Sequence, residues 1–143
     1  MWDDRDVVIV WKRRDRQIRA ELLAGRDFSG RNFDRARLVD LDLRDKHFPG
    51  ASLHRADLTE ADLRGADLRD ANLSGAYLTG ARLRGADLSG ANLDGAYLIA
   101  TELDGASIGG ASMNHIIFDQ ATTWPLGYRP PRPQGISYWH GAR

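Results

Sequence analysis

The sequence predicts a β-solenoid, a rod of short stacked coils, over most of its 143 residues. The first observation is a strict five-residue period, because every fifth residue from Phe28 to Phe118 is Leu, Phe, Ile or Met, at all 19 positions. The second is that Ala stands two residues before 13 of these positions and Gly two residues after 10 of them. This period matches neither a helix nor a lone strand. One five-residue unit cannot bury its own large side chain, so the units must stack.

Each position of the unit has an expected role. The large apolar residue and the Ala point inward, the Gly turns a corner at positive φ, and the two polar positions face water. The units "ADLRG", "ANLSG", "ADLSG" and "ANLDG" resemble the pentapeptide-repeat family, whose motif is A-(D/N)-L-x-x. The resemblance covers residues 26–120 and implies a right-handed quadrilateral β-helix with four units, or 20 residues, per coil. The array then makes a little under five coils.

Residues 1–25 are expected to cap the first coil, because the end of a solenoid exposes an edge that pairs with other chains unless it is covered. The β-branched run "DVVIVW" over 6–11 predicts a strand, and 13–25 predicts an amphipathic helix ended by Gly25. Ile18, Leu22 and Leu23 share one face of that helix, and Ile18 and Leu22 are expected to close the core. Its basic residues form a solvated face or, less favoured, an anion-binding patch.

Residues 121–143 are expected to close the other end and to continue as a Pro-rich tail. The stretch "TTWPLGY" resembles a closing segment that follows many pentapeptide arrays, and Trp124 is the expected plug of the core. The Pro-rich piece cannot form a helix and is expected to run extended over the surface. Tyr138 and Trp139 either dock on the rod, which we favour, or anchor a partner.

Some inward Ala positions hold larger residues. Arg26 and Arg31 occupy them in the first coil, where their side chains are expected to leave past the open end. Lys46 occupies one in the second coil, where an unpaired buried ammonium group would cost several kcal/mol. A local bulge over residues 45–50 that lets Lys46 reach water is favoured over a buried ion pair with a binding role.

Residues 20 positions apart stack, so the outward positions form ladders on four faces. An amide face, which is expected to be structural, carries Asn32, Ser52, Asn72, Asn92 and Ser112. A charged face carries Arg44, Arg64 and Arg84 beside Asp42, Asp62, Arg82 and Glu102. A third face carries an apolar group that we call the tyrosine patch, made of Tyr77, Tyr97, Ile99 and Ile117. The fourth carries His47 and an acidic strip, made of Asp27, Asp67, Asp70 and Asp87.

The tyrosine patch is a candidate interface, because outward positions of a solenoid are otherwise polar and an apolar patch needs a cover. The C-terminal tail and a second copy of the chain are the two candidate covers. A twofold contact between copies, and hence a homodimer, is slightly favoured because such a patch is self-complementary.

The sequence holds no pattern typical of an enzyme. There is no cysteine, and the four histidines have no metal-ligand spacing. No Ser-His-acid set or phosphate loop is present, and the expected interior is filled. We therefore predict no catalysis, no metal and no cofactor. The longest apolar run is too short to cross a membrane, so a cytoplasmic protein without membrane contact is expected. Residues 26–120 hold 15 acidic and 11 basic residues, a net charge of −4, which argues against direct nucleic-acid binding.

Two function classes follow. The first is a non-enzymatic scaffold or interaction module that holds a protein partner. The second is implied by the resemblance, since some family members imitate duplex DNA, bind bacterial type II topoisomerase (gyrase), and give quinolone resistance or toxin immunity. The acidic strip is where such mimicry would lie. The short rod, the small net charge and the absence of an inserted loop depart from that group. Arg outnumbers Lys 18 to 2, which suggests a bacterial genome of high GC content.

Overall fold

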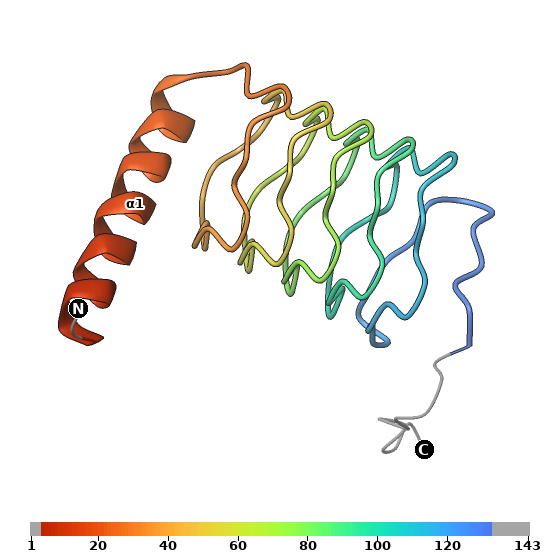
Figure 1. Cartoon of the computed structure of the whole chain (residues 1–143). Helices are drawn as coiled ribbons and strands as arrows, with labels where there is room; N and C mark the ends of the chain where they lie inside the picture. Colours follow the sequence, from red (N-terminus) through yellow and green to blue (C-terminus); the bar gives the residue numbers. More distant parts are fainter. Residues whose placement is uncertain (1–3, 133–143) are drawn as a thin grey trace.

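The computed structural model describes residues 4–132, and side chains from residue 12 onward (Figure 1). One helix, α1 (Asp4–Ala24), lies at one end of a rod of stacked coils, and the described chain ends at the other. Within the described residues the coils are joined by single-residue parallel bridges and contain no longer strand. The rod is therefore a β-solenoid whose sides are each one bridge wide.

The register of the bridges shows the size of each coil. Bridges join residues 20 apart from Asp27–His47 to Tyr97–Ile117, so the predicted coil of four five-residue units is present. The last bridge, Glu102–Thr123, joins residues 21 apart, so the final coil contains one extra residue. The ladder consequently ends at Thr123, slightly beyond the expected residue 120. The right-handed sense of the coil stays a prediction.

The core consists of the inward leucines and alanines, which are almost all completely buried. Two buried threonines stand where an Ala is expected, and each hydroxyl donates to a backbone carbonyl. Thr101 Oγ1 donates to the oxygen of Leu78 at 2.7 Å, and Thr122 Oγ1 to that of Leu98 at 2.6 Å. These bonds satisfy the two hydroxyls, whose burial would otherwise destabilise the rod.

The corners have one backbone conformation throughout the array. All 18 corner residues from 30 to 115 have φ between 53° and 73°, and ten of them are glycine. An Asp or Asn stands three residues before nine of the 18 corners, and its Oδ1 accepts the backbone N–H two residues ahead, which explains the second letter of the motif. For example, Asn32 Oδ1 accepts from Asp34 N–H at 2.8 Å, and Asn92 Oδ1 accepts from Asp94 N–H at 2.9 Å. Such Asx turns shape the backbone that leads into the corner.

Gly85→Ala is expected to lower the free energy of unfolding by about 1 kcal/mol, because Gly85 has φ +71° and an alanine is strained there. No heavy atom lies within 4 Å of the added Cβ, so backbone strain is the whole effect. Ala100→Gly, at φ 53°, is the reverse change and should raise stability by a similar amount. Urea unfolding followed by circular dichroism measures both. Equal midpoints for the wild type and both variants would contradict the assignment of strain to these corners.

The predicted strand over residues 6–11 is wrong, because those residues lie inside α1. No bridge joins them to the first coil, so a strand there would have no partner. The helical penalty of Val and Ile, at most about 0.7 kcal/mol each, is small enough to be overridden where the helix continues from residue 12 onward. The predicted helix therefore exists but is longer, and it ends at Ala24.

Gly25 follows α1 for a reason other than the one expected. Its φ is not positive, and its N–H donates to Glu21 O at 2.8 Å. A Cβ on Gly25 would meet the Phe28 ring at 2.9 Å. Close approach of the chain to Phe28, rather than left-handed geometry, therefore requires glycine here.

Side chains of α1 take the place of a missing preceding coil. Arg14 donates to Asp34 O at 3.1 and 3.2 Å, and Arg19 donates to Val39 O at 3.3 Å. The backbone N–H of Arg37 donates to an Asp15 carboxylate oxygen at 3.4 Å. In later coils the equivalent carbonyl oxygens accept from the coil before, as His54 O does from Arg35 N–H at 2.8 Å. The helix thus caps the exposed edge with side chains, which protects it from pairing with other chains.

The apolar face of α1 closes the first coil with Ile18 and Leu22, which are 8% and 0% exposed. Leu23 was expected on the same face, but it is 60% exposed, so that expectation is wrong. Adjacent helix residues point about 100° apart, so Leu22 and Leu23 cannot both face the coil. Arg26 and Arg31 are exposed as expected, and Arg31 pairs with Glu21 at 2.8 Å.

Candidate functional site

The tyrosine patch forms one contiguous surface on its face of the rod. Bridges stack Tyr77 on Tyr97 and Tyr97 on Ile117, as the 20-residue spacing predicts. The two tyrosine rings are parallel within 10°, with centroids 4.8 Å apart. Tyr77 is 43% exposed and Ile117 is 38% exposed, while Tyr97 and Ile99 are half-buried. The patch is therefore a stacked apolar surface whose two end residues, Tyr77 and Ile117, are the most exposed.

Charged residues border the patch unevenly. On the patch's own face, Asp57 and Asp119 lie at its two ends. The corner that follows the face holds Glu60, whose carboxylate lies over Gly80, whereas the corner that precedes it holds Arg55. The patch therefore has an acidic border on one side and a basic border on the other.

The acidic strip is assembled as predicted but is not a free acidic field. Asp27, Asp67 and Asp87 stack through His47 on one face. Arg69 donates to both carboxylate oxygens of Asp67, at 2.9 and 2.7 Å, and this bond lowers the pKa of Asp67.

The other two stacked acids of the strip bond to local hydroxyl groups. Asp27 accepts from the hydroxyl and the N–H of Ser29, which lowers the pKa of Asp27. The pKa of Asp87 is lowered by hydrogen bonds from Ser89. The three stacked carboxylates of the strip are thus held by neighbours in their own units, and that of Asp67 is neutralised. Asp70 stands at a corner, and its carboxylate lies over Gly90 of the next coil.

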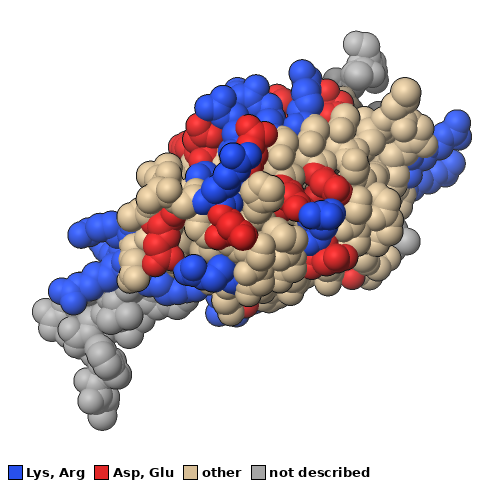
Figure 2. Space-filling model, turned by 90° about the horizontal axis from the view of Figure 1, so that it is seen from above, with Lys and Arg blue, Asp and Glu red and all other residues tan. Residues whose placement is uncertain are grey.

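The charged face pairs internally. Arg44 and Arg64 each form a two-point contact with the Asp two residues earlier, and Arg84 Nε lies 2.8 Å from Asp104. Figure 2 shows one side of the molecule, on which basic and acidic side chains alternate instead of gathering by sign. Such exposed pairs favour solubility and add little stability. They form no field that would steer a strongly charged partner.

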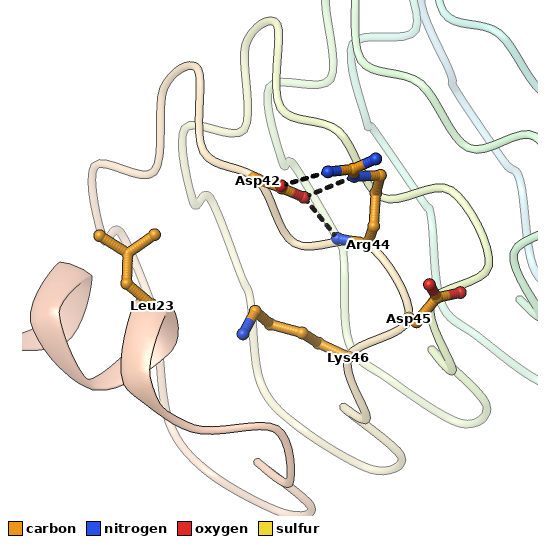
Figure 3. A pocket seen from close by; sticks show the side chains of 5 residues that line it. All are labelled: Leu23, Asp42, Arg44, Asp45 and Lys46. Atoms are coloured by element: carbon orange, nitrogen blue, oxygen red, sulfur yellow. Dashed lines mark hydrogen bonds and ion pairs between the residues drawn. The ribbon is translucent and has the colours of Figure 1, made fainter.

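A shallow cavity of about 420 Å³ lies where α1 meets the end of the first coil and the start of the second (Figure 3). Lys46 extends toward the helix end, and its Nζ donates to Gly25 O at 2.6 Å. The bulge expected at residues 45–50 is absent, because the bridge His47–Asp67 keeps the register. The alternative, a buried ion pair, is absent as well, because Lys46 is half-buried and bonds to a carbonyl. Its role is to cap the last turn of α1, where a positive charge is favourable.

The two basic side chains that line this cavity already have partners. Arg44 binds the carboxylate of Asp42 (Figure 3), and Lys46 donates to Gly25 O. Asp45 adds a further negative charge to the lining. An incoming anion would have to break these contacts, so the cavity does not offer a ready anion site.

A second hollow of about 280 Å³ lies at the C-terminal end of the described chain. Residues 113–118 form one wall and Pro131 and Arg132 the other. Trp124 occupies the inward position of the last unit, half-buried, with its ring centroid 5.3 Å from that of Phe118. The chain then crosses to Tyr128, whose hydroxyl lies 3.5 Å from Met113 Sδ. Tyr138, Trp139 and the rest of the tail beyond Arg132 lie outside the described residues.

The amide face carries a regular polar network. His54 Nδ1 lies 2.7 Å from Ser74 Oγ, and Ser74 in turn donates to Asn72 at 2.6 Å. The hydroxyl proton of Ser74 is thus committed to an amide, which is not the arrangement of an activated nucleophile. Among the described residues no group of three His, Cys, Asp or Glu side chains could hold a metal ion. No helix there is long and apolar enough to span a bilayer.

Comparison with known proteins identifies the repeat. A family model of pentapeptide repeats matches in eight copies over residues 36–75, 47–85 and 81–120, which together cover more than half of the chain. No curated protein sequence matches.

Solved structures also match the chain, and two of those described here are pentapeptide repeat proteins. One, from the Arabidopsis thaliana thylakoid lumen, is 36% identical over 64% of this chain and 60% of its own, with a TM-score of 0.49. HetL from Nostoc, involved in heterocyst differentiation regulation, is 35% identical over 64% of this chain and 48% of its own, with a TM-score of 0.36. The chain thus spans less than two thirds of either protein. QnrB1, a plasmid-mediated fluoroquinolone resistance protein, is 18% identical over 66% of this chain and 72% of its own, with a TM-score of 0.20.

Proposed function

The chain belongs to the pentapeptide-repeat family, and from this premise we propose that it is a non-enzymatic interaction module that binds a protein partner through the tyrosine patch. The observation that carries the proposal is the patch itself, since Tyr77 and Ile117 expose large apolar side chains at positions that are polar elsewhere in the array. A second copy of the chain is the first partner to test. The bacterial, cytoplasmic setting expected from the sequence is part of the same proposal.

The rigidity of the patch supports this function. Tyr77, Tyr97 and Ile117 lie on consecutive bridges, and the stacked rings of Tyr77 and Tyr97 hold each other in place. Aromatic residues that are ordered before binding lose little conformational entropy on association. They are also the residues that most often dominate the binding energy of interfaces.

Tyr97→Arg is expected to abolish self-association or partner binding, because it places a charge in the middle of the patch. The matched control is Ser107→Arg, which adds the same charge at an exposed bridge position on the opposite face. Light scattering measures the mass of both variants and of the wild type, and pull-down measures capture of other proteins. If Tyr97→Arg has the mass and the partners of the wild type, the patch is not the interface.

The alternative function is gyrase binding by imitation of DNA, and the acidic strip would carry it. It has less support than the interaction module, because Arg69 neutralises Asp67 and His47 interrupts the ladder. Titration of the protein into a gyrase supercoiling reaction, with and without a quinolone, separates the two functions. Inhibition or drug rescue that persists in Tyr97→Arg would favour the alternative.

A further inference from the structure

We propose that the C-terminal tail, residues 133–143, lies on the tyrosine patch of its own chain and that a partner must displace it. The inference rests on the proposed function, since it concerns the same surface, and it adds a regulator of that surface. Of the two candidate covers of the patch, the C-terminal tail and a second copy of the chain, the proposal chooses the tail. Three features of the molecule support it: where the described chain ends, how far the tail reaches, and which residues it contains.

The described chain ends beside the patch. After Trp124 the chain crosses the end of the rod to Tyr128, which contacts Met113. Pro131 and Arg132 then line the second hollow together with Ile117, the last residue of the patch. The tail therefore begins next to the exposed end of the surface that it is proposed to cover.

The tail is long enough to cover the patch. Eleven residues in extended form span at most about 36 Å. The patch runs from Ile117 to Tyr77, which is two coil steps or about 10 Å at the spacing of neighbouring strands. The tail can therefore reach the far end of the patch without full extension.

The composition of the tail suits this surface. Ile136, Tyr138 and Trp139 supply large apolar groups, and the tail has no acidic side chain. Aromatic rings stack favourably on an ordered ring such as that of Tyr77. Arg143 at the end of the chain complements Glu60, on the acidic border of the patch. The apolar residues thus match the patch and the charge matches its border.

Disulfide trapping tests the inference, because the native chain has no cysteine. Thr79→Cys with Gly141→Cys places one thiol beside the patch and one in the tail. Ser89→Cys with Gly141→Cys is the matched control, since residues 79 and 89 occupy the same position of the unit on opposite faces. Oxidation of the full chain is followed by non-reducing electrophoresis. We expect the first pair to form a disulfide within one chain at least tenfold faster than the control pair.

Replacing Ile136, Tyr138 and Trp139 by serine should remove this preference, because the apolar contacts are then lost. Equal rates for the two pairs would overturn the inference, since a free tail samples both faces. A product with the mass of two chains, formed only by the first pair, would overturn it as well, because the tail would then cover a second copy. Either result leaves the interface proposal to its own test, Tyr97→Arg in a chain that ends at Arg132.

Discussion

Leu22→Asp is expected to undock α1 and to destabilise the protein by at least about 3 kcal/mol. Leu22 is completely buried where the helix closes the first coil, so the change removes an apolar contact and forces a carboxylate into the core or the helix off the rod. Loss of the helix would expose the cluster of Phe28, Phe33 and Phe48, whose ring centroids lie 5.4 to 6.0 Å apart. It would also uncover the edge that Arg14 and Arg19 protect.

Leu23→Asp is the matched control, because it makes the same change one residue later at a side chain that is 60% exposed. A surface substitution of this kind changes stability by about 0.5 kcal/mol or less. Thermal and urea unfolding give the stability difference, and light scattering detects aggregation through the uncovered edge. If the two variants unfold at the same urea concentration, α1 does not close the coil through Leu22.

Ala86→Lys is expected to prevent folding. Ala86 is 1% exposed and lies in the same stacked column as Lys46, with a coil on either side. Overpacking costs about 1–3 kcal/mol, and a buried unpaired ammonium several kcal/mol more. The total approaches the 5–15 kcal/mol that typically separates folded from unfolded domains.

Lys46→Ala is the matched reverse change, and we expect it to cost only about 1 kcal/mol. Lys46 avoids the cost of burial because the end of α1, rather than another coil, lies on that side of it. Its Nζ donates to Gly25 O there, at 2.6 Å. Circular dichroism and gel filtration of the purified variants measure both effects. If the Ala86→Lys protein is as stable as Lys46→Ala, a lysine at position 86 can reach water, and the burial of this position between two coils does not exclude a charge.

The candidate site was predictable to the extent that it depends on the repeat. The four columns of outward residues follow from the 20-residue coil that the resemblance to the pentapeptide-repeat family implies, and the bridges place Tyr77, Tyr97 and Ile117 together as expected. That Arg69 interrupts the acidic strip can be seen in the sequence, but its two-point contact with Asp67 was not predictable in the same way. This contact is made by side chains two residues apart, at distances that a one-letter pattern does not specify.

The second letter of the motif had a role that the sequence left hidden. Asp and Asn were expected there as polar residues that face water, and the Asn residues of the amide face also as a structural ladder along the rod. The structure shows that their oxygens accept a backbone N–H two residues ahead, as in Asn32 to Asp34. This signal was available in principle, because only short side chains with an oxygen on the γ carbon form Asx turns.

The sequence by itself determined the repeating part of the molecule, because each five-residue unit repeats the same local physics. An inward Leu, a small Ala and a left-handed corner recur every five residues, so each unit can stack on others of its own kind. The number of units in each coil, four, was implied by the family resemblance and is shown by the 20-residue register of the bridges. The ends were decided by the tertiary structure. Residues 6–11 have strand propensity but lie in a helix, and Lys46 keeps the register by bonding to Gly25. At an end one neighbouring coil is missing, so contacts between segments of different sequence, rather than the repeat, determine the conformation there.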